Sequence, residues 1–289
     1  MQNSDSAIQH AKNFLQKGLL QDAEQALREF LAQHSDSAEA HFLLGYVLFK
    51  EQKPEASLAE YTAGAKYHDP DPSDLKIVAL NYVLLNDFSD ADRWLTRSVA
   101  GNPKDPESWY YLGRTKYNEN RLEDATRAFK ECLEIDPGNV KAATNLGLAL
   151  QGLGKTDEAL ALYRHAIAMQ KEGAPRNAEP FIDLGNLLLE QNQIDVAIVN
   201  LSEGRDIAPQ DSRARESLGK AYLRANRFPE AQAELEKAVS LTPDSAPAHY
   251  LLAQVYRNQG LTQRAKAEFD RAAVLNDSKS SVAPVKPML

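Results

Sequence analysis

The stretch from Pro106 to Asn139 reads PESWYYLGRTKYNENRLEDATRAFKECLEIDPGN. Its apolar residues recur at the i, i+3, i+4, i+7 spacing of amphipathic helices, and they do so in two blocks. The polar run Asn120-Arg121 separates the blocks. The closing run Asp136-Pro137-Gly138-Asn139 carries the residue types that end one helix and start the next. The stretch therefore predicts a pair of helices followed by a tight connection.

The same pattern recurs along the chain at a fixed step. One small residue per copy returns every 34 positions, with a single longer step of 38, at Ala23, Ser57, Ala91, Ala125, Ala159, Ala197, Ala231 and Ala265. Self-similarity at a period of this length indicates a repeat array. A single helix pair cannot cover its own apolar surface, whereas stacked pairs bury a continuous core. Function is then expected on an extended surface rather than in a catalytic pocket.

The copies resemble the tetratricopeptide repeat, a helix–turn–helix unit with the pattern W-x2-L-G-x2-Y, then A-x3-F-x2-A, then Pro. The best-matching copy places these residues at Trp109, Leu112, Gly113, Ala125, Phe129, Cys132 and Pro137. The resemblance covers nearly the whole chain and implies an all-α fold, a right-handed α-solenoid (superhelix) of about eight antiparallel units. We expect one array over 4–279 and a disordered tail over 280–289, with units starting near 4, 38, 72, 106, 140, 178, 212 and 246.

Two places depart from the regular period. The segment 171–178 contains four extra residues, with Gly173 and Pro175 as helix breakers. It is either a loop on the rim of the array or a change in twist that divides the groove. The other place is the C-terminal end, where Pro284 and Pro287 exclude a further long helix. A poorly capped last pair would allow weak self-association there.

Composition excludes several classes of function. The 289 residues include 33 Lys and Arg against 41 Asp and Glu, which gives a net charge of −8 and argues against nucleic-acid binding. No apolar run reaches the length of a membrane span. The single cysteine, Cys132, stands in a small-residue column and is expected to be a buried thiol. We expect a soluble protein of the cytoplasm or, if the chain is a mature exported domain, of the periplasm.

The catalytic-looking strings fall on repeat positions. Gly154-Lys155-Thr156 matches part of a phosphate loop, but it follows a predicted helix and occupies the turn that every copy has. His41 and His249 stand in the column of Trp109, and no histidine has a metal-ligand spacing. We therefore expect no catalytic residues, no metal and no cofactor, and predict that the chain is not an enzyme.

The resemblance implies that the first helix of each unit lines the inside of the superhelix. The inward residues that we expect to contact a partner are Phe42, Tyr46, Phe49, Lys76, Tyr110, Arg114, Tyr117, Asn145, Asn186, Lys220, Arg224, Tyr250 and Arg257, with Leu80, Ile182 and Leu189 among the apolar ones. The N-terminal half of this surface is aromatic and the C-terminal half is basic, with Arg213 near its rim. Aromatic and arginine side chains often supply most of the binding energy of an interface.

These residues predict a non-catalytic scaffold or adaptor that uses its groove to assemble a protein complex. Its partner would be a protein or an extended peptide, with an acidic group or a C-terminal carboxylate on the basic half. The carboxylate clamp of chaperone-binding family members is not supported, because Leu80 and Tyr111 stand where asparagines are needed. Two alternatives stay open. The charged inward residues could simply keep the groove hydrated, or the chain could be an accessory or regulatory subunit acting through its convex face, its tail or self-association.

Overall fold

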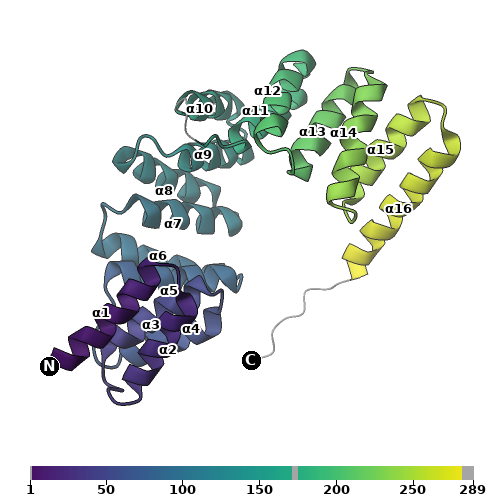
Figure 1. The fold of residues 1–289 in the computed structure, drawn as a ribbon. Coiled ribbons are helices and arrows are strands. Elements are labelled where there is room, and N and C mark those ends of the chain that lie inside the picture. The colour runs from purple at the N-terminus through teal and green to yellow at the C-terminus, as the bar shows by residue number, and fades with distance from the viewer. Residues whose placement is uncertain (1, 171–174, 282–289) are drawn as a thin grey trace. The chain divides into compact units, whose positions relative to one another are not determined.

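Figure 1 shows the computed structural model of the protein, which describes residues 2–170 and 175–281. Over these ranges the chain forms sixteen helices and no strand. The helices belong to two compact units, Met1–Leu153 and Gly154–Leu289, which we call the N-terminal and the C-terminal unit and describe separately. The predicted all-α fold of helix–turn–helix repeats is confirmed.

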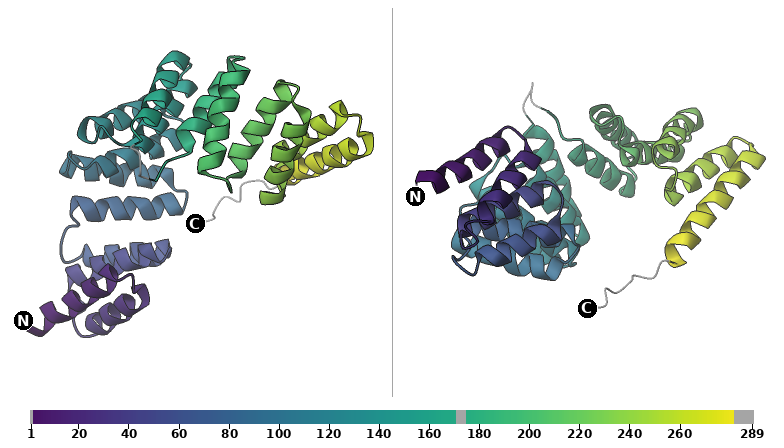
Figure 2. Two further views of the ribbon diagram at one scale, coloured as in Figure 1. Left: turned by 45° about the horizontal axis from the view of Figure 1, so that its top comes forward. Right: turned by 60° about the horizontal axis from the view of Figure 1, so that its bottom comes forward.

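Each unit stacks helix pairs together with one single helix, α9 in the N-terminal unit and α10 in the C-terminal unit, and Figure 2 shows successive pairs side by side within each one. The helices of the N-terminal unit are α1 (Gln2–Gln16), α2 (Leu20–Leu31), α3 (Ala38–Lys50), α4 (Pro54–Gly64), α5 (Pro72–Leu84), α6 (Phe88–Gly101), α7 (Pro106–Asn118), α8 (Leu122–Ile135) and α9 (Val140–Gly152). Those of the C-terminal unit are α10 (Thr156–Ala168), α11 (Glu179–Glu190), α12 (Ile194–Ile207), α13 (Ser212–Arg224), α14 (Phe228–Leu241), α15 (Ala246–Asn258) and α16 (Thr262–Ser281).

The turn inside each repeat passes through one residue with positive φ. These residues keep the sequence period, and their φ angles lie between 57° and 77°: Gly18, Gln52, Asn86, Asn120, Gly154, Asn192, Asn226 and Gly260. Glycine and asparagine tolerate this left-handed conformation best. Gly154 therefore occupies the same turn as its siblings and directly follows a helix, so it does not form a phosphate loop.

The connection between repeats supplies a helix cap. A side-chain oxygen accepts a hydrogen bond from a backbone N–H in the first turn of the following helix at Ser37, Asp71, Asp105, Asn139, Asp211 and Ser245. These residues satisfy donors that would otherwise lack partners. Helix α11 is the exception, because its N-cap Ala178 has no such side chain. The exception coincides with the predicted insertion, of which 171–174 lie outside the described residues.

Close packing within a pair depends on the glycine of the Leu-Gly column. A methyl group at Gly113 would lie 2.6 Å from a ring carbon of Phe129, which is fully buried. At Gly219 the same group would lie 2.5 Å from Leu235. The glycine therefore leaves the room that the large residue of the second helix occupies. Cys132 is buried as predicted, and burial raises its pKa to about 11.

The C-terminal end differs from the prediction. Helix α16 runs to Ser281, so Ser280 and Ser281 are helical although we expected them in the tail. No proline interrupts the chain before Pro284, and the helix can therefore continue through the polar segment. The rest of the predicted tail, 282–289, lies outside the described residues. Within the described ranges, no helix combines the length and the apolar run that crossing a bilayer requires.

Candidate functional site

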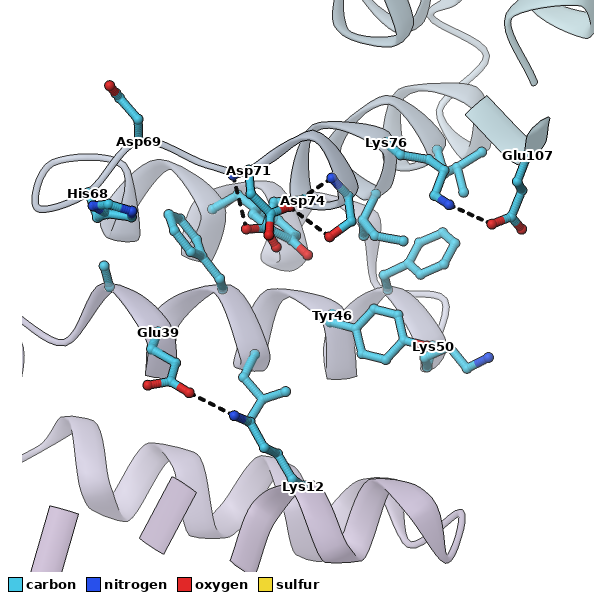
Figure 3. Close-up of a pocket in the computed structure, with 18 of the residues that line it drawn as sticks. Lys12, Glu39, Tyr46, Lys50, His68, Asp69, Asp71, Asp74, Lys76 and Glu107 are labelled. Atoms are coloured by element: carbon cyan, nitrogen blue, oxygen red, sulfur yellow. Dashed lines mark hydrogen bonds and ion pairs between the residues drawn. The ribbon is translucent and has the colours of Figure 1, made fainter. Parts of the chain in front are cut away.

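The N-terminal unit contains a groove of about 1030 Å³. First helices of successive repeats form it: α1, α3 and α5, with the start of α7 at one end (Figure 3). Among the predicted contact residues, Phe42, Tyr46, Phe49, Lys76 and Leu80 line it, although Leu80 is only 8% exposed. The lining also includes Lys12, Glu39, Lys50, Tyr61, Asp71 and Asp74, together with residues of the α4–α5 connection. The structure thus gathers five predicted residues into one groove.

The apolar wall comes from helix α3. Tyr46 and Phe49 are half-buried and keep part of their rings available to a ligand. Phe42 is different, because it is only 8% exposed and stacks on Tyr61 with ring centroids 5.7 Å apart. Its ring occupies the space left by Gly64, where a methyl group would lie 2.6 Å away. Phe42 is therefore mainly a core residue, contrary to its prediction as an open contact.

Ion pairs neutralise Lys12 and Lys76, two of the three lysines that line the groove. Lys12 Nζ lies 2.7 Å from Glu39 Oε1. Lys76 Nζ lies 2.5 Å from Glu107 Oε2 and 3.0 Å from Asp105 Oδ2. Burial alone would lower the pKa of Lys76, but these two carboxylates outweigh it and raise the pKa. Lys76 thus lines the groove as predicted but is already paired within the protein.

The start of α5 brings two carboxylates into the groove. Asp71 Oδ1 accepts bonds from the backbone N–H groups of Ser73 and Asp74, at 2.7 and 2.9 Å. Burial would raise the pKa of Asp71, but the hydrogen bonds from Ser73 and from the backbone lower it overall. Burial, followed by the charge of Asp71, raises the pKa of Asp74 to about 6. Asp71 is therefore a stable anion, whereas Asp74 titrates close to neutrality.

Other predicted contact residues of the N-terminal unit do not line this groove. Tyr110 is half-buried and packs against Tyr111 and Phe129. Arg114 is exposed and its guanidinium lies 5.8 Å from the Tyr110 ring centre, while Tyr117 is 37% exposed. The last predicted contact residue of this unit is Asn145 on α9. Its side-chain amide donates a hydrogen bond to the Lys141 carbonyl of the same helix.

The basic residues predicted for the C-terminal unit are partly engaged with the protein. Arg224 donates to the Leu189 carbonyl and, at 2.9 Å, to Asn192 Oδ1. Arg213 lies 3.8 Å from the buried Asp183. Lys220 is exposed on α13. The remaining predicted positions are distributed over the unit: Asn186 is half-buried, Tyr250 is 52% exposed and packs edge-on against Phe269, and Arg257 lies 5.8 Å from the same ring.

Two apolar predictions in this unit are wrong. Ile182 is fully buried and Leu189 is 1% exposed. Ile182 fills the space beside Gly204, where a methyl group would lie 2.9 Å from its side chain. Both residues belong to the core rather than to a binding surface.

Sequence reasoning missed the acidic end of the groove. The run Asp71-Pro72-Ser73-Asp74 forms a capping box, which signals the start of a helix. Such a signal does not say toward which neighbours the carboxylates point. Tyr61 was also missed, because it stands in the column of large core residues.

Comparison with known families matches the tetratricopeptide repeat at residues 8–74, 106–139, 139–210, 188–254 and 222–279. The chain belongs to the tetratricopeptide repeat family. No group of three or more His, Cys, Asp or Glu suited to a metal ion occurs in the part of this repeat array that the structure describes.

Two curated relatives are similar to this chain over part of the array. Protein CTR9 homolog of Arabidopsis thaliana is 27% identical over 168 residues, which are 56% of this chain and 14% of that protein. The peroxisomal targeting signal receptor of Saccharomyces cerevisiae is 26% identical over 122 residues, 42% of this chain and 19% of the receptor. The chain thus spans less than a fifth of the length of these relatives.

A solved tetratricopeptide repeat protein from Parabacteroides merdae matches the fold. Its TM-score is 0.69 with 19% identity, over 88% of this chain and 99% of that one. At this identity the similarity concerns the fold alone.

Proposed function

We propose that the protein is a non-catalytic scaffold that binds a protein or an extended peptide through the first helices of its repeats. The observation that carries this proposal is the groove between α1, α3 and α5, which is large enough for a peptide segment. Tyr46 and Phe49 offer it aromatic surface. Partly exposed aromatic residues in a groove are typical of binding sites.

The relatives support this class of function by name. One of them is named as a receptor for a peroxisomal targeting signal. We extend to this chain only the binding of a protein segment. Assembly of a larger complex, as expected of an adaptor, forms part of the same proposal.

For the C-terminal unit we propose a separate contact with an acidic group or a C-terminal carboxylate. Lys220 and Arg257 would supply the positive charge, and Tyr250 would supply aromatic surface. Arg224 would contribute less, because its guanidinium already bonds to the end of α11. Weak self-association through the C-terminal end stays a prediction.

The proposal is tested by affinity capture from the source organism, with mass spectrometry of the bound proteins. Wild-type protein and a Tyr46→Ala/Phe49→Ala variant serve as baits. A Tyr67→Ala variant is the matched control, because Tyr67 is 54% exposed and does not line the groove. We expect a partner that the wild type and the control retain and the groove variant loses. Equal capture by all three baits would place binding elsewhere.

A further inference from the structure

The acidic end of the N-terminal groove has unused binding capacity. Figure 3 shows Asp71 and Asp74 close together at the start of α5, while Asp69 points away from them. Within the described residues, no ion pair involves Asp71 or Asp74. Asp71 accepts its hydrogen bonds on Oδ1, and Asp74 accepts one on Oδ2 from the Asp71 backbone at 3.3 Å. In the described part of the chain, no hydrogen bond reaches Asp71 Oδ2 or Asp74 Oδ1, so each carboxylate keeps one oxygen for a ligand.

A buried hydroxyl lies in the same place. Tyr61 lines the groove and is only 3% exposed, and its Oη has no hydrogen-bond partner within the described residues. Tyr61, Asp71 and Asp74 line the same groove. Burial raises the pKa of Tyr61, and the charges of Asp74 and Asp71 add to this rise. A buried polar atom without a partner costs free energy, and native proteins contain few of them. A ligand that donates a hydrogen bond here would remove this cost.

The charges of the other residues that line the groove decide whether such a ligand is positive or negative. Lys12 is paired with Glu39, and Lys76 is paired with Asp105 and Glu107. Lys50 is the third lysine of the lining, and Asp69, Asp71 and Asp74 supply three further carboxylates, so the groove keeps an excess of negative charge. Lysine and arginine side chains carry only donors and a positive charge, so they match two carboxylates and a hydroxyl.

We propose that the groove binds an extended peptide whose basic side chain, arginine or lysine, contacts Asp71, Asp74 and the Tyr61 hydroxyl. Apolar neighbours in the peptide pack on Tyr46 and Phe49. This inference rests on the proposed function and adds the chemistry of the partner. It gives the N-terminal groove the opposite preference from the acidic group expected for the C-terminal unit.

The test selects random 12-residue peptides displayed on phage against the full chain. We expect the enriched peptides to share a basic residue beside apolar ones. A synthetic copy of the best peptide, measured by fluorescence polarisation, should bind the Asp71→Asn/Asp74→Asn variant roughly tenfold more weakly. Asparagine caps a helix as well as aspartate does, so this variant keeps the start of α5. Tyr61→Phe should weaken binding by about two- to fivefold without loss of stability, because its hydroxyl has no partner to lose.

A Glu55→Gln variant controls for the loss of one charge, because Glu55 is exposed on α4 and outside the groove. Replacing the basic residue of the peptide by glutamine tests the same contact on the wild-type protein, independently of any variant that folds poorly. Groove-dependent peptides that lack basic residues, or unchanged binding by the double Asp variant, would overturn the inference. If instead no selected peptide is sensitive to Tyr46→Ala/Phe49→Ala, the proposed function itself fails.

Discussion

At the scale of single residues, the burial of one carboxyl group lowers the free energy of unfolding at neutral pH. Asp183 on α11 is 7% exposed, and the nearest basic group, that of Arg213, is 3.8 Å away. Burial raises its pKa from 3.8 to about 6, although the Arg213 charge opposes the shift. The folded protein therefore keeps a proton that the unfolded chain releases between these values. The free energy of unfolding falls as the pH rises through this window and stays lower above it.

Asp183→Asn should therefore stabilise the protein at neutral pH. We expect the free energy of unfolding at pH 7 to rise by as much as about 3 kcal/mol, since the pKa shift is about two units and one unit corresponds to about 1.4 kcal/mol. Below about pH 3 Asp183 is protonated in both the folded and the unfolded wild type, and the difference should vanish. Urea denaturation of the wild type and the variant, at neutral and at acidic pH, measures the difference in the free energy of unfolding under both conditions. A variant that is less stable at pH 7 would show that the pair with Arg213 outweighs the burial of Asp183.

A second residue-scale prediction concerns the turn of the second repeat. Gln52 has a φ of 60°, where the other repeats use glycine or asparagine. Asparagine adopts this conformation more readily, so Gln52→Asn should raise the free energy of unfolding by about 0.5–1 kcal/mol. The reverse exchange, Asn86→Gln, should lower it by a similar amount. Thermal melts of both variants test these two predictions. Melting temperatures that shift in the same direction would contradict the explanation.

At the scale of helices, one small residue on the second helix of each pair decides which side chain of the first helix is buried. In three of the repeats this residue is Gly64, Ser98 or Gly204. Where it is Gly64 or Gly204, the large residues Phe42 and Ile182 fill the space. Where it is Ser98, the hydroxyl instead bonds to the Pro72 carbonyl. The sequence register correctly placed the residues on the first helix. It could not separate groove from core, because that depends on the size of the residue opposite.

The column of Trp109 shows a shared role for different side chains. His41, Trp109, Arg215 and His249 each place a ring or guanidinium nitrogen within hydrogen-bonding distance of the carbonyl oxygen six residues earlier. His41 and His249 also bond to a glutamate on the second helix of the pair, at 2.7 and 2.5 Å. These bonds join the preceding connection, the first helix and the second. The prediction that these histidines are repeat positions agrees with this geometry.

The closeness of the two helices in a pair gives an element-scale prediction. Gly113→Ala would bring a methyl group within 2.6 Å of the buried Phe129 ring and should cost about 1–3 kcal/mol of stability. Gly138→Ala is the control, because the nearest atom to its methyl group would be 3.6 Å away. Chemical denaturation should show a loss for the first variant and little change for the second. Equal effects would argue against the close approach.

At the scale of the whole molecule, the period of the sequence predicts most of the fold. Each repeat contacts its neighbours through the same columns, so one clear copy such as 106–139 defines the others. The binding surface is less predictable, because it arises where neighbouring repeats differ. Asp71 and Asp74 belong to one repeat, and Phe49 and Lys12 belong to two others. No single column contains this combination, and only the folded unit brings its members together.

The most direct test of the binding groove is calorimetric titration of the captured partner segment into purified protein. Wild type, Tyr46→Ala/Phe49→Ala and Tyr67→Ala are compared after circular dichroism has shown equal helicity. We expect the groove variant to bind at least about tenfold more weakly and the control to bind like the wild type, as for residues that supply much of the energy of an interface. Equal affinities for all three proteins would contradict the assignment of the groove as the binding site.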